Sequence, residues 1–301
     1  MHWILASLVS AFFLGCYDLA TKQSVRENAV LPVLFWTNVC SALVWLALMA
    51  WQSASPDIFP PLPELLLVEP VSPKQHLLLA LKSAIVAASW ICSYFAVKHL
   101  SVSLAAPIRA TGPVWTLFGA LLVLGERPAW LQVLGVVITI GSFIGLSFAG
   151  RREGVHFHRD KWIWLLVAGT LIGAVSALYD KFLLGRLGFR ASTVQAWFAI
   201  YLTAIFLPLA LGWKFRLWPR KTFHWRWGIP LMSLTLLAAD FLYFNALRDS
   251  DALVSLVSSF RRGSTLVAFA GGLLFFHEPN GLQKLPAVIG VLAGIVLTII
   301  G

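Results

Sequence analysis

The apolar stretch from Arg109 to Glu126 reads RATGPVWTLFGALLVLGE, with an arginine at its start and a glutamate at its end. A second stretch, from Arg261 to Glu278, reads RRGSTLVAFAGGLLFFHE and has its arginine and glutamate at the same separation of 17 positions. A charge near the centre of a bilayer costs about 2.5 to 3.5 kcal/mol, so it needs a partner, water or a function. The matching stretches therefore indicate a duplicated chain with a charged interior.

Further features of the sequence recur in the same order. Tyr17-Asp18 ends the first apolar run of the chain, and Tyr179-Asp180 ends the sixth. The segment YFAVKHL at 94–100 resembles YFNALRD at 243–249. Paired glycines four positions apart lie in the fifth run (Gly141 and Gly145) and in the tenth (Gly290 and Gly294). This order predicts two homologous halves, residues 1–150 and residues 151–301.

The composition places this chain in a membrane. Its 301 residues are 59% hydrophobic, which is too apolar for a soluble domain of this size. A helix needs about 20 mostly apolar residues to cross the hydrocarbon core. Ten such runs lie near 2–22, 31–51, 75–97, 102–124, 130–149, 162–182, 191–213, 226–247, 252–276 and 282–300. We expect an all-α polytopic membrane protein, and five spans in each half make the two repeats inverted relative to each other.

Several classes of function are disfavoured by the sequence. The net charge of +10 comes largely from basic residues in short loops, where such charges set membrane topology, so no nucleic-acid partner is expected. No GxxxxGK[ST], CxxC, HExxH or GxSxG motif is present. We expect no catalytic residues, no metal and no cofactor. Cys16, Cys40 and Cys92 fall inside predicted spans, where a disulfide is not expected.

Charged and aromatic residues inside the spans are the candidates for a substrate pathway. They are Asp18, Tyr17, Lys82, Trp90, Tyr94, Arg109, Asp180, Tyr179, Asp240, Arg261 and Arg262. For some of them a structural role is an open alternative. Asp18 and Asp180 lie near span ends and have Lys22 and Lys181 close by as partners. Asp240 needs a partner from another helix, and Trp90 and Tyr94 have the spacing of ordinary packing residues.

Polar residues also recur at helical spacing within three of the spans. Lys82, Ser89 and Ser93 share one face of the third span, and Arg109, Gly112 and Thr116 share a face of the fourth. The ninth span has Ser255, Ser258, Arg262 and Thr265 in a similar stripe. We expect these stripes to face a cavity rather than lipid. Gly112 and Pro113 are also expected to loosen the fourth span beside Arg109.

The segments 100–146 and 253–297, which contain the two stretches quoted first, resemble the closing halves of two EamA repeats of the drug/metabolite transporter superfamily. The resemblance is strongest around Pro113 and Gly125-Glu126. In the second half His277 stands in place of the glycine, and no proline matches Pro113. The resemblance implies ten helices, with helices one to four and six to nine along the pathway. It also implies that helices five and ten are peripheral and able to form a contact between copies.

These features predict a secondary transporter of the cell membrane, either a plasma or an inner membrane. It would move a small polar or charged organic metabolite by alternating access, with a proton on Asp18, Asp180 or Asp240 as one means of coupling. The alternatives are a non-transporting membrane scaffold or sensor and, from a third class, a membrane-embedded enzyme. The orientation is open: the basic loops favour termini outside the cell, whereas EamA-like permeases usually keep both termini in the cytoplasm.

Overall fold

The computed structural model describes residues 2–54, 60–100, 108–109, 111–148, 161–217, 222–264, 266–267, 270–271 and 281–300. The α-helices are α1 (His2–Val25), α2 (Val30–Ser53), α3 (Pro73–His99), α5 (Gly112–Gly119), α6 (Trp130–Phe148), α7 (Lys161–Lys181), α8 (Ala191–Lys214), α9 (Gly228–Arg248), α10 (Val254–Arg261) and α12 (Gly281–Ile300). A π-helical segment extends α5 (Ala120–Leu124) and another extends α7 (Phe182–Arg186), and Glu64–Leu66 form a 3-10 turn. No strand occurs in these segments, which confirms the all-helical prediction.

Each of the ten predicted apolar runs overlaps one of these helices. Among the described residues, six helices are long and apolar enough to cross a membrane, namely His2–Val25, Val30–Ser53, Pro73–Ala96, Lys161–Arg186, Ala191–Lys214 and Gly228–Arg248. Three apolar helices within the same residues are shorter, Gly112–Leu124, Trp130–Ser142 and Ile289–Ile300. The chain is therefore an integral membrane protein.

Local sequence fixes where individual helices begin and end. At the start of α3, the Ser72 hydroxyl accepts from the Gln75 amide, and the Ser72 amide donates to the Gln75 side chain at 2.8 Å. This reciprocal cap satisfies two amides that have no partner in the first helical turn. The π-helical extension of α5 ends at Gly125, which has a φ of 69°. Glycine adopts this left-handed conformation without the steric cost that a side chain brings.

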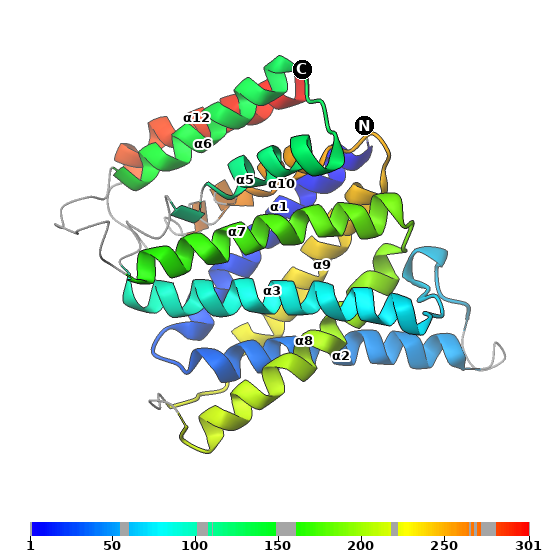
Figure 1. Cartoon of the computed structure of the whole chain (residues 1–301). Helices are drawn as coiled ribbons and strands as arrows, with labels where there is room; N and C mark the ends of the chain where they lie inside the picture. The colour runs from blue at the N-terminus through cyan, green and yellow to red at the C-terminus, as the bar shows by residue number, and fades with distance from the viewer. Residues whose placement is uncertain are drawn as a thin grey trace.

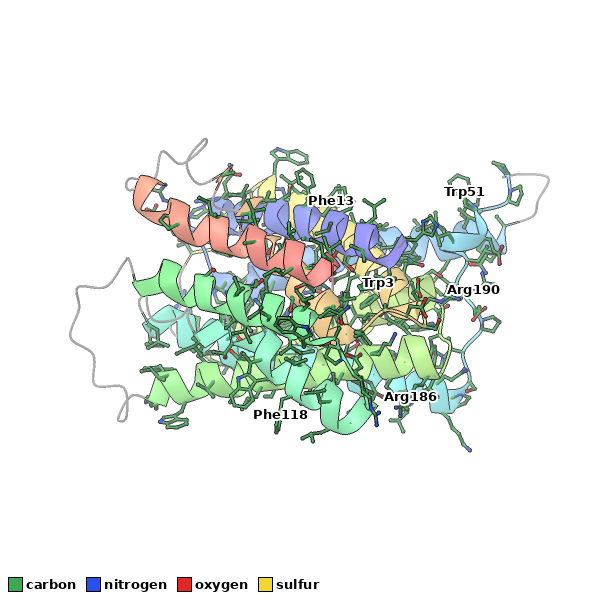
Figure 2. All side chains as sticks on the ribbon, turned by 90° about the horizontal axis from the view of Figure 1, so that it is seen from above. Trp3, Phe13, Trp51, Phe118, Arg186 and Arg190 are labelled. Carbon is green, nitrogen blue, oxygen red and sulfur yellow. The ribbon has the colours of Figure 1, made fainter. Side chains whose placement is uncertain are left out.

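The helices form a bundle with both chain termini at the same end, marked in the upper part of Figure 1. We call this the terminus end and the opposite one the far end. Trp51, Arg186 and Arg190 lie at the terminus end (Figure 2). The most extensive helix contacts join α1 to α9, α3 to α7, α6 to α12 and α2 to α8. Each of these four pairs combines one helix from the first half of the sequence with one from the second half.

Helices α6 and α12 lie side by side along one edge of the bundle and pack through small residues (Figure 1). A Cβ atom added to Gly135 would lie 2.5 Å from the Gly294 carbonyl oxygen, and one added to Gly294 would lie 2.6 Å from that of Gly135. Gly290 contacts the Ser142 side chain in the same way. Gly290 and Gly294 thus serve packing within the chain, whereas Gly141 has open space around it. A contact between copies through these two helices stays a prediction.

Replacing Gly135 with Val should destabilise the protein by about 1–3 kcal/mol, because the α6 and α12 backbones would have to separate. The measurement is the thermal unfolding of the purified protein in detergent. Gly141→Val is the matched control on the same helix, since no atom lies within 4 Å of the added Cβ position. Equal melting temperatures for the two variants would contradict the close α6–α12 contact.

Candidate functional site

The helical backbone is interrupted between Arg109 and α5. Ile108 and Arg109 are helical, Thr111 is in a turn, and α5 begins at Gly112 with Pro113 in its first turn. Proline has no amide hydrogen and favours the first turn of a helix, so the break follows from the sequence as predicted. The ninth segment is interrupted at the matching place: α10 ends at Arg261, and Arg262 and Gly263 form a turn. Both repeated arginines therefore sit at helix breaks.

Lys82 of α3 and Asp180 of α7 form an ion pair inside the bundle. The residues are only 1% and 4% exposed. The Lys82 ammonium also lies over the rings of Phe198 and Phe244, at 4.4 and 4.7 Å from their centroids. Aromatic faces attract cations, so they hold the charge that water would otherwise solvate. Together, these contacts fix the ammonium group between three helices.

The sequence alternative that paired Asp180 with its neighbour Lys181 is wrong. The Lys181 ammonium instead donates to the carbonyl oxygens of Leu247 and Asp249, at 3.2 and 2.8 Å. Successive residues of a helix point about 100° apart, so Asp180 faces α3 while Lys181 faces the end of α9.

A second ion pair lies beside the first. Arg261 Nη2 of α10 is 2.7 Å from Asp240 Oδ1 of α9, which confirms that Asp240 finds its partner on another helix. The guanidinium carbon lies 4.1 Å from the centroid of the Tyr243 ring. Asp180 interacts electrostatically with Asp240 and Arg261, and with the hydroxyl of Tyr243. The two ion pairs thus form one network, which we call the terminus-end network (Lys82, Asp180, Asp240, Tyr243 and Arg261).

Asp18, Arg109 and Arg262 form a second charged group, which we call the far-end group. The charges of Arg109, Arg262 and Arg261 act on the Asp18 carboxyl group. Asp18 and Arg109 are exposed, and Arg262 is partly buried. Within the described part of the chain, neither Arg109 nor Arg262 has a hydrogen bond or an ion pair. Among the described residues, only the charge of Asp18 opposes these two guanidinium groups.

Arg262 packs directly on the start of α5. A Cβ atom added to Gly112 would lie 2.6 Å from Arg262 Nη2, so only glycine leaves room for the guanidinium there. Next to this place, the hydroxyls of Tyr17 and Tyr94 interact with each other, and Tyr94 also experiences the charges of Arg109 and Asp18. The two phenols of Tyr17 and Tyr94 thus lie beside the two cations and one carboxylate of the far-end group.

The two charged groups lie at different depths of the bundle. Lys82 is nine residues from the start of α3, which places it about 14 Å from the terminus end at 1.5 Å per residue. Asp18 is seven residues from the last residue of α1, about 10 Å from the far end. Together the two groups hold four bases and three acids, so one positive charge has no counterpart among them.

The sequence pattern of the EamA-like transporter family matches residues 1–148. Residues 1–148 belong to this family. The match indicates a membrane transporter of the drug/metabolite transporter type. A search of curated proteins found no match. Among the 28 chains of solved structures that match, one titled "Crystal structure of protein" superposes with a TM-score of 0.72 at 15% sequence identity. The match covers 99% of this chain and 98% of that one, and it supports the fold alone.

Other predicted site residues of this EamA-like chain lie in contacts between helices. Trp90 stacks on Phe206 of α8 with 6.1 Å between ring centroids. The Tyr179 hydroxyl donates to the Leu78 carbonyl oxygen of α3 at 3.2 Å. Their part in a substrate pathway stays a prediction. The prediction that the serine stripe of α3 faces a cavity is wrong. Ser89 donates to the Gly169 carbonyl oxygen of α7 at 2.7 Å, so this face packs on a helix.

From the sequence, Tyr243 was not predicted as a site residue, and Glu126 was given no role. Tyr243 occupies the position in YFNALRD that Tyr94 has in YFAVKHL, and this repeat was the signal that would have identified it. Glu126, whose repeat counterpart Glu278 lies outside the described residues, binds the first turn of α10. Its carboxylate accepts from the Val254 amide at 2.7 Å and from the Ser255 hydroxyl at 2.8 Å. A carboxylate at a helix start satisfies amides that lack partners.

Thr265, from the predicted stripe of the ninth span, also lies outside the described residues. Among those described, no group of three or more His, Cys, Asp or Glu side chains is arranged to hold a metal ion.

Proposed function

We propose that this EamA-like protein is a secondary transporter that moves a small organic anion across the cell membrane by alternating access. The observation that carries the proposal is the pair of free guanidinium groups, Arg109 and Arg262, at the two helix breaks. Cations inside an apolar bundle are costly without a partner, and arginine binds carboxylates and phosphates through two parallel hydrogen bonds. A bound anion would complete the far-end group.

Three further features favour an anion over a neutral or cationic metabolite. The charged groups carry one uncompensated positive charge, which a monoanion would neutralise. The start of α5 lies beside Arg262, and helix N-termini attract negative charge. Interrupted helices whose ends point at a bound ligand are also common in secondary transporters. The hydroxyls of Tyr17 and Tyr94 add hydrogen-bonding groups for the rest of the molecule.

We further propose that residues 1–150 and 151–301 are inverted five-helix repeats that form ten membrane spans. The helix contacts support this, because exchanging the halves turns each of the four closest pairs either into itself, as for α2 with α8 and α6 with α12, or into another close pair. Under the exchange, α1 with α9 becomes α7 with α3, and α5 with α7 becomes α10 with α1. The charged residues follow the same rule: Asp18 interacts with Arg109, and Asp180 interacts with Arg261.

The two charged groups differ in their exposure, and this difference supports alternating access. The terminus-end network is largely buried and holds two ion pairs, whereas Asp18 and Arg109 are exposed. In this conformation the substrate reaches the site from the far end, and the terminus-end network closes the other side. In the opposite conformation the repeat-related group at the far end closes. Protonation of Asp18, Asp180 or Asp240 would weaken these pairs and so couple a proton to the change.

Uptake into sealed proteoliposomes tests the transport function. The panel should pair small carboxylates and phosphate monoesters with neutral and cationic compounds of similar size. Accumulation of at least one anion above protein-free vesicles is the expected result. A ligand that raises the melting temperature without being accumulated would instead favour a sensor. Equal uptake of cations and anions would contradict the charge argument.

Gly112→Ala tests the site within that assay. The added methyl group occupies the place of Arg262 Nη2, so the guanidinium is displaced and the KM for the anion should rise about tenfold, the equivalent of one weakened charge-assisted hydrogen bond. Folding should be unaffected, because alanine is a better helix former than glycine. Gly141→Ala is the control with open space at the added atom. An unchanged KM in Gly112→Ala would show that Arg262 does not bind the anion.

A further inference from the structure

A small cavity lies between α2, α8 and α9, beside Asp240. It is lined by Asn38, Ser41, Gln195, Phe198, Ala199, Leu236, Leu237 and Asp240. Its volume is about 10 Å³, which is room for about one water-sized particle. Four of the eight lining side chains are polar, which is unusual for the interior of a membrane protein.

In the side-chain amides of Gln195 and Asn38, the nitrogen atom makes the hydrogen bond, so the oxygen atom remains available. Gln195 Nε2 donates to the Leu237 carbonyl oxygen at 2.7 Å, and Asn38 Nδ2 donates to that of Leu34 at 2.8 Å. A carbonyl oxygen accepts only from a donor, so these contacts fix which end of each amide carries nitrogen. Gln195 Oε1 is buried and has no partner among the described residues, and its residue is 2% exposed.

The remaining polar atoms of the cavity are oxygens as well. Asp240 uses Oδ1 for Arg261, and no contact of the described residues occupies its Oδ2. The Ser41 hydroxyl pairs with that of Ser233 at 2.8 Å and keeps a lone pair free. A site with amide, hydroxyl and carboxylate oxygens matches the needs of a hard cation. Its size excludes an organic cation.

We propose that this cavity binds one sodium ion, through Gln195 Oε1, Asn38 Oδ1, Ser41 Oγ and the Asp240 carboxylate. The charges facing Asp240 determine when it binds. Arg261 neutralises Asp240 from α10, and the neighbouring Asp180 is neutralised by Lys82. Sodium and Arg261 therefore compete for one carboxylate. Sodium binding releases Arg261 toward Asp18, on which its charge already acts, and so opens the terminus-end network.

The binding claim stands independently of transport, whereas its role as a coupling ion rests on the proposed function. Binding is measured on the purified full-length protein in detergent, as the melting temperature in sodium chloride against choline chloride at equal ionic strength. Sodium should raise the melting temperature by about 2–4 °C, a typical effect of a ligand well above its dissociation constant. Because no substrate is needed, failure here leaves the uptake experiment intact.

Three variants locate the site. Gln195→Met has a similar volume without the oxygen and should abolish the sodium shift, whereas Gln52→Met, which loses an amide bonded to Val68 outside the cavity, should keep it. Arg261→Gln should bind sodium about tenfold more tightly, because the competing cation is gone. A wild-type protein equally stable in sodium and choline would overturn the proposal and leave a water molecule as the occupant. An unchanged sodium shift in Gln195→Met would overturn it too.

Discussion

Lys82→Met should lower the free energy of unfolding by about 3–5 kcal/mol, because the substitution leaves Asp180 buried without a counter-charge. Both residues are almost fully buried, and the two phenylalanine rings around the ammonium offer nothing to a lone carboxylate. Unfolding by denaturant in detergent measures the effect. Lys74→Met is the matched control, since Lys74 is an exposed lysine in the first turn of the same helix.

The double variant Lys82→Met/Asp180→Asn separates a lost ion pair from a lost packing contact. Removing the charge of Asp180 should recover most of the stability, so that the two substitutions are strongly non-additive. It also keeps the prediction testable if Lys82→Met alone does not fold. Lys82→Met that is as stable as Lys74→Met, or a double variant no better than the single one, would show that the pair is not buried as described.

Replacing both free arginines, Arg109→Gln/Arg262→Gln, should lower kcat/KM for the transported anion at least about a hundredfold. A hydrogen bond between charged groups contributes about 1.5–3 kcal/mol, which is a factor of roughly ten or more for each arginine. Each single variant should raise KM by about tenfold. Proteoliposome uptake measures both, and the melting temperature of the double variant shows whether it is folded.

Arg248→Gln is the control for this variant, because Arg248 is exposed in the last turn of α9. It should change KM less than twofold. If Arg248→Gln impaired transport as much as Arg109→Gln, the arginines would act through the overall charge of the protein and not through a site.

The helices were predictable because an apolar run of membrane-spanning length has few alternatives to a helix. The break beside Arg109 was predictable too, since Gly112 and Pro113 act locally. The need of Asp240 for a partner also followed from the sequence, because a buried carboxylate cannot remain alone.

The identity of the partners was not predictable. Lys82 and Asp180 meet only because α3 packs on α7, and apolar surfaces give no sequence signal for which helices pack together. Lys181 was nearer in sequence, but proximity along a helix does not bring adjacent residues to one face. The Ser89 stripe was misread for the same reason, since small polar residues suit both a wet cavity and a close helix contact.

The bond between Glu126 and the first turn of α10 has a mechanical consequence. Glu126 follows α5 in the first half, and its carboxylate holds the start of α10 in the second half. These hydrogen bonds join the end of α5 to the start of α10. A displacement of the end of α5 would therefore pull on the start of α10 in the other half as long as these hydrogen bonds hold.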